Sequence, residues 1–153
     1  MAPGTRSAER PTCSGDGETS RASVAVMERL NISSGSPFEA TVGFSRAVRI
    51  GDRVLVAGTA PIWPDGSVDP DVGNQARRCL EIMLRALAEA GGEAGDVVRT
   101  RMFITDAEDG ARIGEAHGEV FSGIRPAATM VVVSGLLDPR WKVEMELEAL
   151  LRS

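Results

Sequence analysis

Three glutamates near the end of the chain, Glu144, Glu146 and Glu148, have the spacing that could most readily do chemistry. They alternate with apolar residues, a period of two that predicts a strand with one apolar and one acidic face: Val143, Met145, Leu147, Ala149 and Leu151. On a solvated face these carboxylates only keep the strand soluble. On a face that meets another surface, partial desolvation raises the pKa of a carboxyl toward the range that suits a general base. Glu144, closest to the strand start, is then the candidate acid–base residue at the mouth of a cleft.

Histidine and cysteine are too scarce for most metal and nucleophile chemistry. His117 is the only histidine and falls on the apolar stripe of an expected helix, which indicates a packed residue. Of the two cysteines, Cys13 lies in a polar segment and Cys79 in a helical pattern, and their spacing calls for no disulfide. This leaves no zinc ligand set, and the sequence contains no nucleophile elbow and no glycine-rich nucleotide-binding motif. We expect neither a metal nor a cofactor.

Composition argues against nucleic acid and membrane partners. The net charge is -5, aromatic residues make up 4% and there is no tyrosine, so neither a basic face nor a base-stacking platform is expected. No apolar run is long enough to cross a bilayer, and the Arg- and Ser-rich start has no apolar signal-peptide core. These features favour a cytoplasmic protein that handles a small metabolite.

The chain divides into a tail and one domain. Residues 1–26 are mainly Gly, Ser, Pro, Thr and charged residues, which cannot bury enough apolar surface to offset the entropy of ordering. We expect this segment to be disordered, the domain to occupy residues 27–153, and Met27 to be a candidate native start.

Six strands and two helices are expected in the domain. The strands are residues 28–31, 45–50, 53–59, 97–104, 127–133 and 142–151, and the helices are residues 72–90 and 107–121. This order predicts an α+β fold, a mixed sheet with both helices on one face. The continuous apolar runs at 54–57 and 131–133 indicate that the other face is also partly buried. Because no element remains to cover that face, we expect self-association.

Six short segments match one set of family signatures in order and spacing. They are Gly43–Val48 (family G-P-Y-S-Q-A-V), Ala57–Pro61 (S-G-Q-x-P), Gln75–Glu81 (Q-x-R-Q-x-L-E), Asp96–Thr100 (D-V-V-K-T), Arg125–Thr129 (P-A-R-[ST]) and Val143–Glu146 (V-E-I-E). On these segments the chain resembles the RidA/YjgF family, once called the L-PSP endoribonuclease or translation-initiation-inhibitor family. The resemblance implies a chorismate-mutase-like fold of the AroH type and a homotrimer with a β-barrel core and three clefts between subunits.

The resemblance also implies site residues. In the deaminase branch, an arginine in P-A-R-[ST] holds the substrate carboxylate. The last-strand glutamate activates water, so that 2-aminoacrylate-type imines become 2-keto acids and ammonia. Carried onto this chain, Glu144 is the catalytic position, and the ligand-binding positions are Phe44, Gly58, Thr59, Gly114, Ala128 and Met130.

Several of these positions depart from the family pattern. Ala128 stands at the arginine position, and alanine cannot replace a charged, bidentate guanidinium. Phe44, Gly114 and Met130 stand where the family has tyrosine, asparagine and cysteine. We therefore expect a more apolar cleft and a less acidic substrate, since loss of one charge-assisted contact costs carboxylate binding about 1.5–3 kcal/mol. Nearby arginines that could compensate are Arg46 and Arg125.

Three functions follow from these residues. The first is an imine or enamine deaminase in which Glu144 is the acid–base group. The second is a non-catalytic ligand-binding or regulatory trimer, which Ala128 favours. The third is an endoribonuclease or translation inhibitor, as the old family name suggests, which the acidic charge and the scarcity of aromatic residues oppose.

Overall fold

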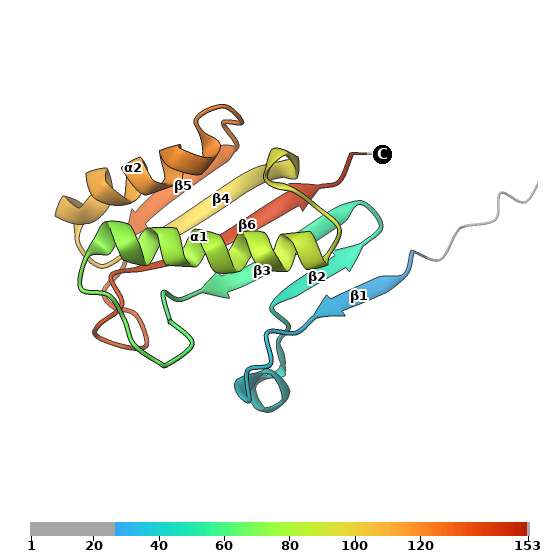
Figure 1. Cartoon of the computed structure of the whole chain (residues 1–153), viewed down its shortest axis with the longest axis horizontal. Coiled ribbons are helices and arrows are strands. Elements are labelled where there is room, and N and C mark those ends of the chain that lie inside the picture. The colour runs from blue at the N-terminus through green and yellow to red at the C-terminus, as the bar shows by residue number, and fades with distance from the viewer. Residues whose placement is uncertain (1–26, 153) are drawn as a thin grey trace, which may run out of the picture.

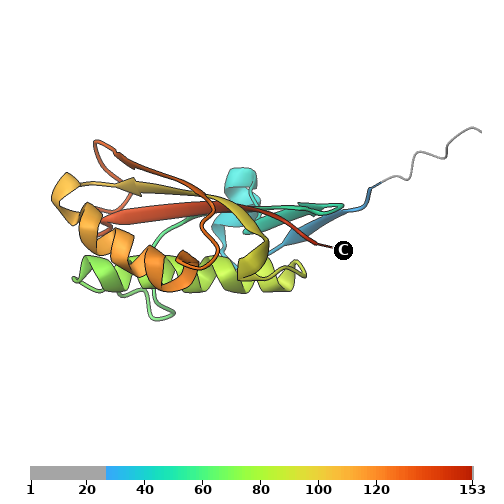
Figure 2. The same cartoon turned by 90° about the horizontal axis from the view of Figure 1, so that it is seen from above.

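The computed structural model describes residues 27–152, in which one six-stranded sheet carries two helices on one face (Figures 1 and 2). The strands run in the spatial order β1-β2-β3-β6-β4-β5. Their bounds are Arg29–Ile32 (β1), Ala47–Ile50 (β2), Arg53–Thr59 (β3), Val97–Ile104 (β4), Ala127–Val132 (β5) and Val143–Leu150 (β6). Every neighbouring pair is antiparallel except β4 and β5, so the sheet is mixed as expected. The tail expected at residues 1–26 lies outside the described residues.

Helix α1 (Val72–Glu89) buries an apolar stripe against β3 and β6, and this stripe consists of Ala76, Cys79, Leu80, Met83 and Leu87. Its start is capped by Asp71, whose side chain accepts a hydrogen bond from the backbone N–H of Asn74 at 2.9 Å. Gly91, which follows the helix, has a φ of +88°, a conformation that glycine adopts without strain. On the sheet side, every second residue of β6 is buried beneath the helix. These residues are Val143, Met145, Leu147 and Ala149. The apolar side of the last strand is thus the core, as its period of two predicts.

Helix α2 (Gly110–Phe121) begins later than expected. Residues Ala107–Asp109 form a 3-10 turn (η3), in which Asp106 accepts a hydrogen bond from the backbone N–H of Glu108 at 2.9 Å. The interpretation of His117 as a packed residue is confirmed. Its Nε2 lies 2.9 Å from the hydroxyl of Thr100, and its ring lies 4.7 Å from that of Phe121.

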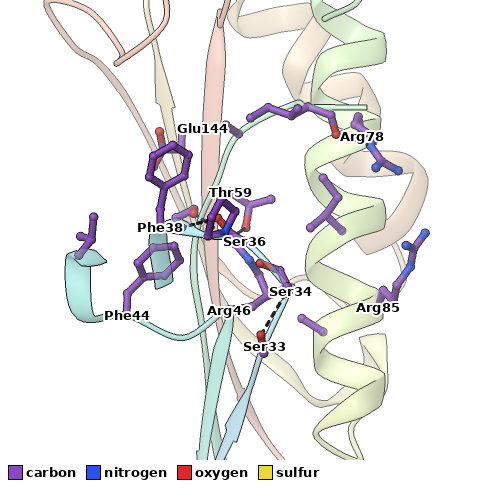
Figure 3. Close-up of a pocket in the computed structure, with 18 of the residues that line it drawn as sticks. Ser33, Ser34, Ser36, Phe38, Phe44, Arg46, Thr59, Arg78, Arg85 and Glu144 are labelled. Atoms are coloured by element: carbon purple, nitrogen blue, oxygen red, sulfur yellow. Dashed lines mark hydrogen bonds between the residues drawn. The ribbon is translucent and has the colours of Figure 1, made fainter. Parts of the chain in front are cut away.

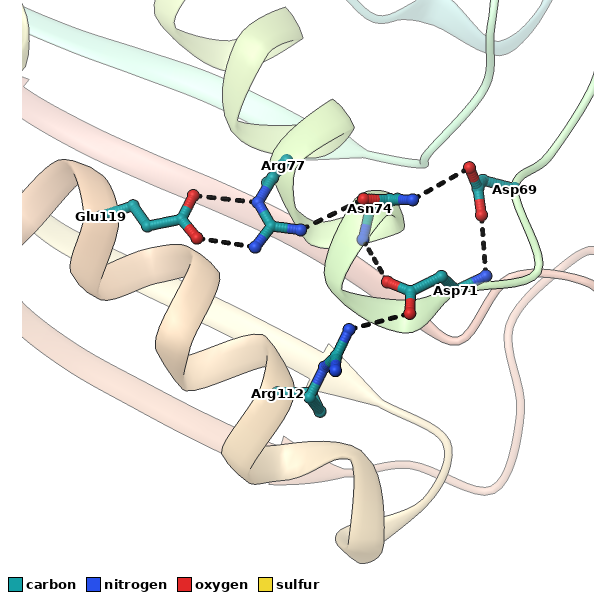
Figure 4. A network of polar contacts seen from close by, with 6 residues as sticks. All are labelled: Asp69, Asp71, Asn74, Arg77, Arg112 and Glu119. Carbon is teal, nitrogen blue, oxygen red and sulfur yellow. Dashed lines mark hydrogen bonds and ion pairs between the residues drawn. The ribbon is translucent and has the colours of Figure 1, made fainter.

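Surface ion pairs join the first turns of α1 to α2 (Figure 4). Arg77 donates to both carboxylate oxygens of Glu119, at 2.9 and 2.6 Å, and Arg112 donates to Asp71 at 2.8 Å. Because these side chains are about half exposed, each pair contributes only about 0.2–1 kcal/mol. Their main effect is to fix the position of α2 against α1.

One element was not predicted. Residues Glu39–Gly43 form a single π-helical turn (η1) inside the expected loop, on the side of the sheet opposite to α1 and α2 (Figure 2). The Glu39 carboxylate accepts hydrogen bonds from the hydroxyl groups of Ser33 and Ser34, at 2.5 and 2.6 Å, and from the backbone N–H of Ser34 at 2.7 Å. These contacts close the loop 33–43 on itself.

Candidate functional site

A cleft of about 1000 Å³ opens where β3 ends, between the segment before β2 and helix α1 (Figure 3). Residues 33–46 form one wall, and one side of α1 forms the other. The end of β3, the loop after it and the start of β6 lie between these walls. The regular pairing of β3 with β6 is interrupted between Val56 and Thr59, which moves the end of β3 out of register. The cleft therefore lies at an irregularity of the sheet.

Gln75 holds the start of β6 in place beside this cleft. Its side chain, 1% exposed, donates to the carbonyl oxygens of Asp69 and Arg140 at 2.7 and 3.0 Å. Its own oxygen accepts from the backbone N–H of Lys142 at 2.8 Å. The side-chain NH2 group and the side-chain oxygen of Gln75 are thus both hydrogen-bonded, and they tie α1 to the loop that leads into Glu144.

Glu144 faces the cleft against the backbone of Gly58. A Cβ atom at position 58 would lie 2.5 Å from the Oε1 of Glu144, so only glycine leaves room for the carboxylate there. Burial raises the pKa of Glu144 above its ordinary value of 4.5. The charge of Arg46 opposes this rise, and the charge of Glu146 adds to it. Glu144 is therefore a stronger base than a solvated glutamate.

Arg46 brings a fixed positive charge into the same cleft. Its Nη1 donates to the carbonyl oxygen of Gly58 and to the hydroxyl of Thr59, both at 2.9 Å. That hydroxyl in turn donates to the carbonyl oxygen of Ala57 at 2.8 Å. The guanidinium carbon lies 5.9 Å from the centre of the Phe44 ring, within the range of a cation–π contact. The cleft thus holds a carboxylate and a guanidinium, both partly removed from water.

Comparison with known proteins places the chain in a family. The family model described as Endoribonuclease L-PSP matches residues 34–151. The chain belongs to this family, RidA/YjgF. It is 40% identical over 121 residues to an uncharacterized protein of Streptomyces coelicolor, covering 77% of this chain and 89% of that protein. It is 32% identical over 111 residues to an Escherichia coli protein named as reactive intermediate deaminase TdcF, covering 70% of this chain and 84% of that protein.

Solved structures of RidA/YjgF proteins share the fold. Rv2704 of Mycobacterium tuberculosis, described as a member of the YjgF/YER057c/UK114 family, matches with 43% identity and a TM-score of 0.75. The match covers 81% of this chain and all of that one. Escherichia coli TdcF with bound serine matches with 29% identity and a TM-score of 0.68, covering 84% of this chain and 98% of that one. The expected chorismate-mutase-like architecture, a mixed sheet with two helices, is confirmed.

Only some of the positions predicted from the RidA/YjgF resemblance meet in the cleft of one chain. Phe44, Gly58, Thr59 and Glu144 line it. Three others lie elsewhere: Gly114 on the exposed side of α2, and Ala128 and Met130 on the edge strand β5. Ala128 pairs with Thr100 and Met130 with Met102, two strands away from the start of β6. Of the two arginines proposed to compensate, Arg46 lies in the cleft lining, whereas Arg125 is exposed before β5.

The site positions carried over from the RidA/YjgF family include none on the α1 side of the cleft. Ile82, Ala86, Arg78 and Arg85 line it there, opposite the loop that carries Phe38 (Figure 3). The helical period identifies Ile82 only as a residue beside the buried stripe, so what it faces depends on tertiary structure. The opposite wall carried no local signal either, because the serines that contact Glu39 lie five and six residues before it, beyond the spacing of a capping pattern.

Two further observations apply to residues 27–152. No group of three or more His, Cys, Asp or Glu side chains in this part is arranged to hold a metal ion. No helix in the described part has the length and hydropathy needed to cross a membrane.

Proposed function

We propose that the protein hydrolyses small imines or enamines to carbonyl compounds and ammonia, with Glu144 as the acid–base group. The observation that carries this proposal is the half-buried carboxylate of Glu144, which faces a cleft and has a raised pKa. The similarity to a protein named as a reactive intermediate deaminase supports the same reaction class.

The reaction needs little more than one well-placed base. Ionised Glu144 takes a proton from water as the water oxygen bonds to the imine carbon, and the C=N double bond becomes a single bond. The proton then passes from Glu144 to the amine nitrogen. Glu144 next takes the proton of the new hydroxyl group and passes it to the same nitrogen. As the carbonyl forms, the C–N bond breaks with its electron pair on nitrogen, and ammonia leaves. An enamine first takes a proton on carbon and loses one from nitrogen, which converts it to the imine.

We infer a homotrimer from the face of the sheet opposite to α1 and α2. Leu55 and Val131 on this open face are 41% and 43% exposed, and α1 and α2 both lie on the other side of the sheet (Figure 2). Its charges are already paired within the chain, since Glu148 meets Arg53 at 2.9 Å and Arg101 meets Glu146 at 2.6 Å. Charges that are paired in advance lower the desolvation cost of covering this face with other copies.

A non-catalytic ligand-binding trimer is the second candidate, and Ala128 is the observation that favours it. The family arginine at this position holds the substrate carboxylate, and alanine supplies no charge. An endoribonuclease is not supported, because the net charge of -5 opposes RNA binding. In addition, His117 of α2 contacts Thr100 of β4 and does not line the cleft.

An amino-acid oxidase assay separates the two candidates. The oxidase generates imines from a panel of amino acids, and the release of keto acid and ammonia is followed with and without the protein. The deaminase proposal predicts acceleration over buffer of about 100-fold or more at saturating protein. Thermal stabilisation by keto acids without any acceleration would instead establish the ligand-binding candidate.

A further inference from the structure

The guanidinium of Arg46 is held firmly at one nitrogen and left unpaired at another. Its Nη1 makes two hydrogen bonds, to the Gly58 carbonyl oxygen and the Thr59 hydroxyl. Its Nε is buried and has no acceptor among the described residues. A buried donor without an acceptor costs about 1–3 kcal/mol, so a ligand oxygen that reached Nε would satisfy a donor that the described residues leave unpaired.

The surroundings of Arg46 suit an anionic ligand atom. Phe44 lies against the guanidinium, and burial lowers the pKa of Arg46 from its ordinary value, an effect that Glu39 and Glu144 oppose through their charges. Lowering the pKa of an arginine in this way still leaves it charged near neutral pH. A partly desolvated guanidinium binds a carboxylate more tightly than a solvated one does.

Thr59 fixes the orientation of this cation. Its hydroxyl donates to the Ala57 carbonyl oxygen and accepts from Arg46, so both functions of the hydroxyl are engaged within the chain. Thr59 thus acts here as a positioning residue for Arg46. Because Nη1 is committed to this contact, Nε and Nη2 form the remaining edge of the planar fork, and such an edge matches the two oxygens of a carboxylate.

We propose that Arg46 determines specificity by binding the carboxylate of the ligand, in place of the arginine that the family carries at the position of Ala128. This proposal rests on the proposed function and names the substrate class: imines that keep the carboxylate of an amino acid, with the reacting carbon toward Glu144. It replaces the expectation of a less acidic substrate, because the cleft contains a cation that comes from the segment before β2.

The test compares an acid with its neutral amide. The probes are 4-methyl-2-oxopentanoate and 4-methyl-2-oxopentanamide, and their dissociation constants are measured by isothermal titration on the full chain. The wild-type protein should bind the acid at least about tenfold more tightly than the amide. Arg46→Gln should weaken binding of the acid about 10- to 100-fold and leave binding of the amide within about twofold, which removes the preference.

The control is Arg112→Gln. Arg112 lies outside the cleft lining, and its side chain is 54% exposed and paired with Asp71, so this variant should keep the wild-type preference. Arg46→Lys covers the case in which the glutamine variant fails to fold. It keeps the charge without the planar fork, and its preference for the acid should fall several-fold.

Three results would overturn the role of Arg46: no preference for the acid in the wild-type protein, equal weakening of both probes in Arg46→Gln, or an unchanged preference in Arg46→Lys. Because binding is measured without turnover, the outcome is independent of imine hydrolysis. An inactive protein that still loses its acid preference in Arg46→Gln would refute the deaminase proposal and support this one.

Discussion

At the residue scale, the site depends on a close approach between a carboxylate and a glycine. Gly58 has no side chain at the point where the Oε1 of Glu144 lies, and the carbonyl oxygen of Gly58 also accepts from Arg46. The missing side chain of Gly58 leaves room for the Glu144 carboxylate, and the backbone carbonyl of the same residue holds the Arg46 guanidinium.

Gly58→Ala should separate folding from activity. The added methyl group would meet the flexible end of Glu144, which can rotate away, so the fold should survive. The displaced carboxylate should lower kcat for imine hydrolysis about tenfold or more. The measurement is kcat together with the unfolding temperature, and the control is Gly123→Ala, where nothing lies within 4 Å of the added methyl group. An alanine variant with full activity would show that the position of Glu144 is not critical.

The raised pKa of Glu144 has two opposite consequences for pH dependence. Hydrolysis needs the ionised carboxylate, so activity should rise with pH through a pKa above the ordinary 4.5. Stability should change in the other direction. Because the folded pKa exceeds the unfolded value, the folded state binds more protons between the two values. The contribution of Glu144 to stability is then lost as pH rises through the folded pKa.

At the element scale, the sequence predicted the core elements more closely than the loops. Helix α1 is expected at residues 72–90 and found at Val72–Glu89, because its apolar stripe and its glycine stop are local signals. The π-helical turn at Glu39–Gly43 was missed, because it depends on contacts between Glu39 and serines five and six residues earlier. Its pattern is too short to show a helical period.

The lining of the cleft was predictable to the same extent. Glu144 and Gly58 follow from the family signatures and line the cleft, as does Arg46. The roles given to these residues stay predictions. What residue patterns could not show is that Ile82 and Ala86 of α1 face the loop 33–38 across the cleft. That contact joins segments far apart in the sequence, and no local period encodes it.

Helix α2 carries a glycine that can be replaced with a gain in stability. Gly114 lies in the middle of the helix, and nothing lies within 4 Å of an added Cβ atom. Gly114→Ala should raise the free energy of unfolding by about 0.5–1 kcal/mol, because alanine loses less backbone entropy in a helix. Thermal unfolding measures the effect, and Gly91→Ala serves as the contrast. Gly91 has a positive φ, and a Cβ atom added there would lie 2.8 Å from the Nη1 of Arg49, so alanine should be destabilising at this position. A loss of stability in Gly114→Ala would indicate that another surface packs against this position.

At the scale of the whole molecule, the sheet carries its helices on one face and leaves apolar and paired charged side chains on the other. Exposure of these apolar side chains to water is unfavourable, and covering the face with other copies of the chain would bury them. The same assembly is the route by which Ala128 and Met130 of one copy could approach the cleft of another.

Sedimentation equilibrium measures this assembly directly. At micromolar concentration the protein should have three times the mass of the 16.2 kDa chain. Leu55→Asp, which places an unpaired charge on the open face, should shift the distribution toward smaller species. A wild-type protein that sediments as a single chain would remove the basis for a homotrimer.

The account as a whole depends on Glu144 as the group that performs the hydrolysis, and the pH–rate profile tests this most directly. Imines are generated by an amino-acid oxidase, and the hydrolysis rate is measured between about pH 4 and 8 for the wild-type protein and for Glu144→Gln. We predict a wild-type rate that rises through a pKa above 4.5, and a glutamine variant that is about 100-fold slower and lacks that rise. A glutamine variant with the same rate and the same profile as the wild-type protein would contradict the account.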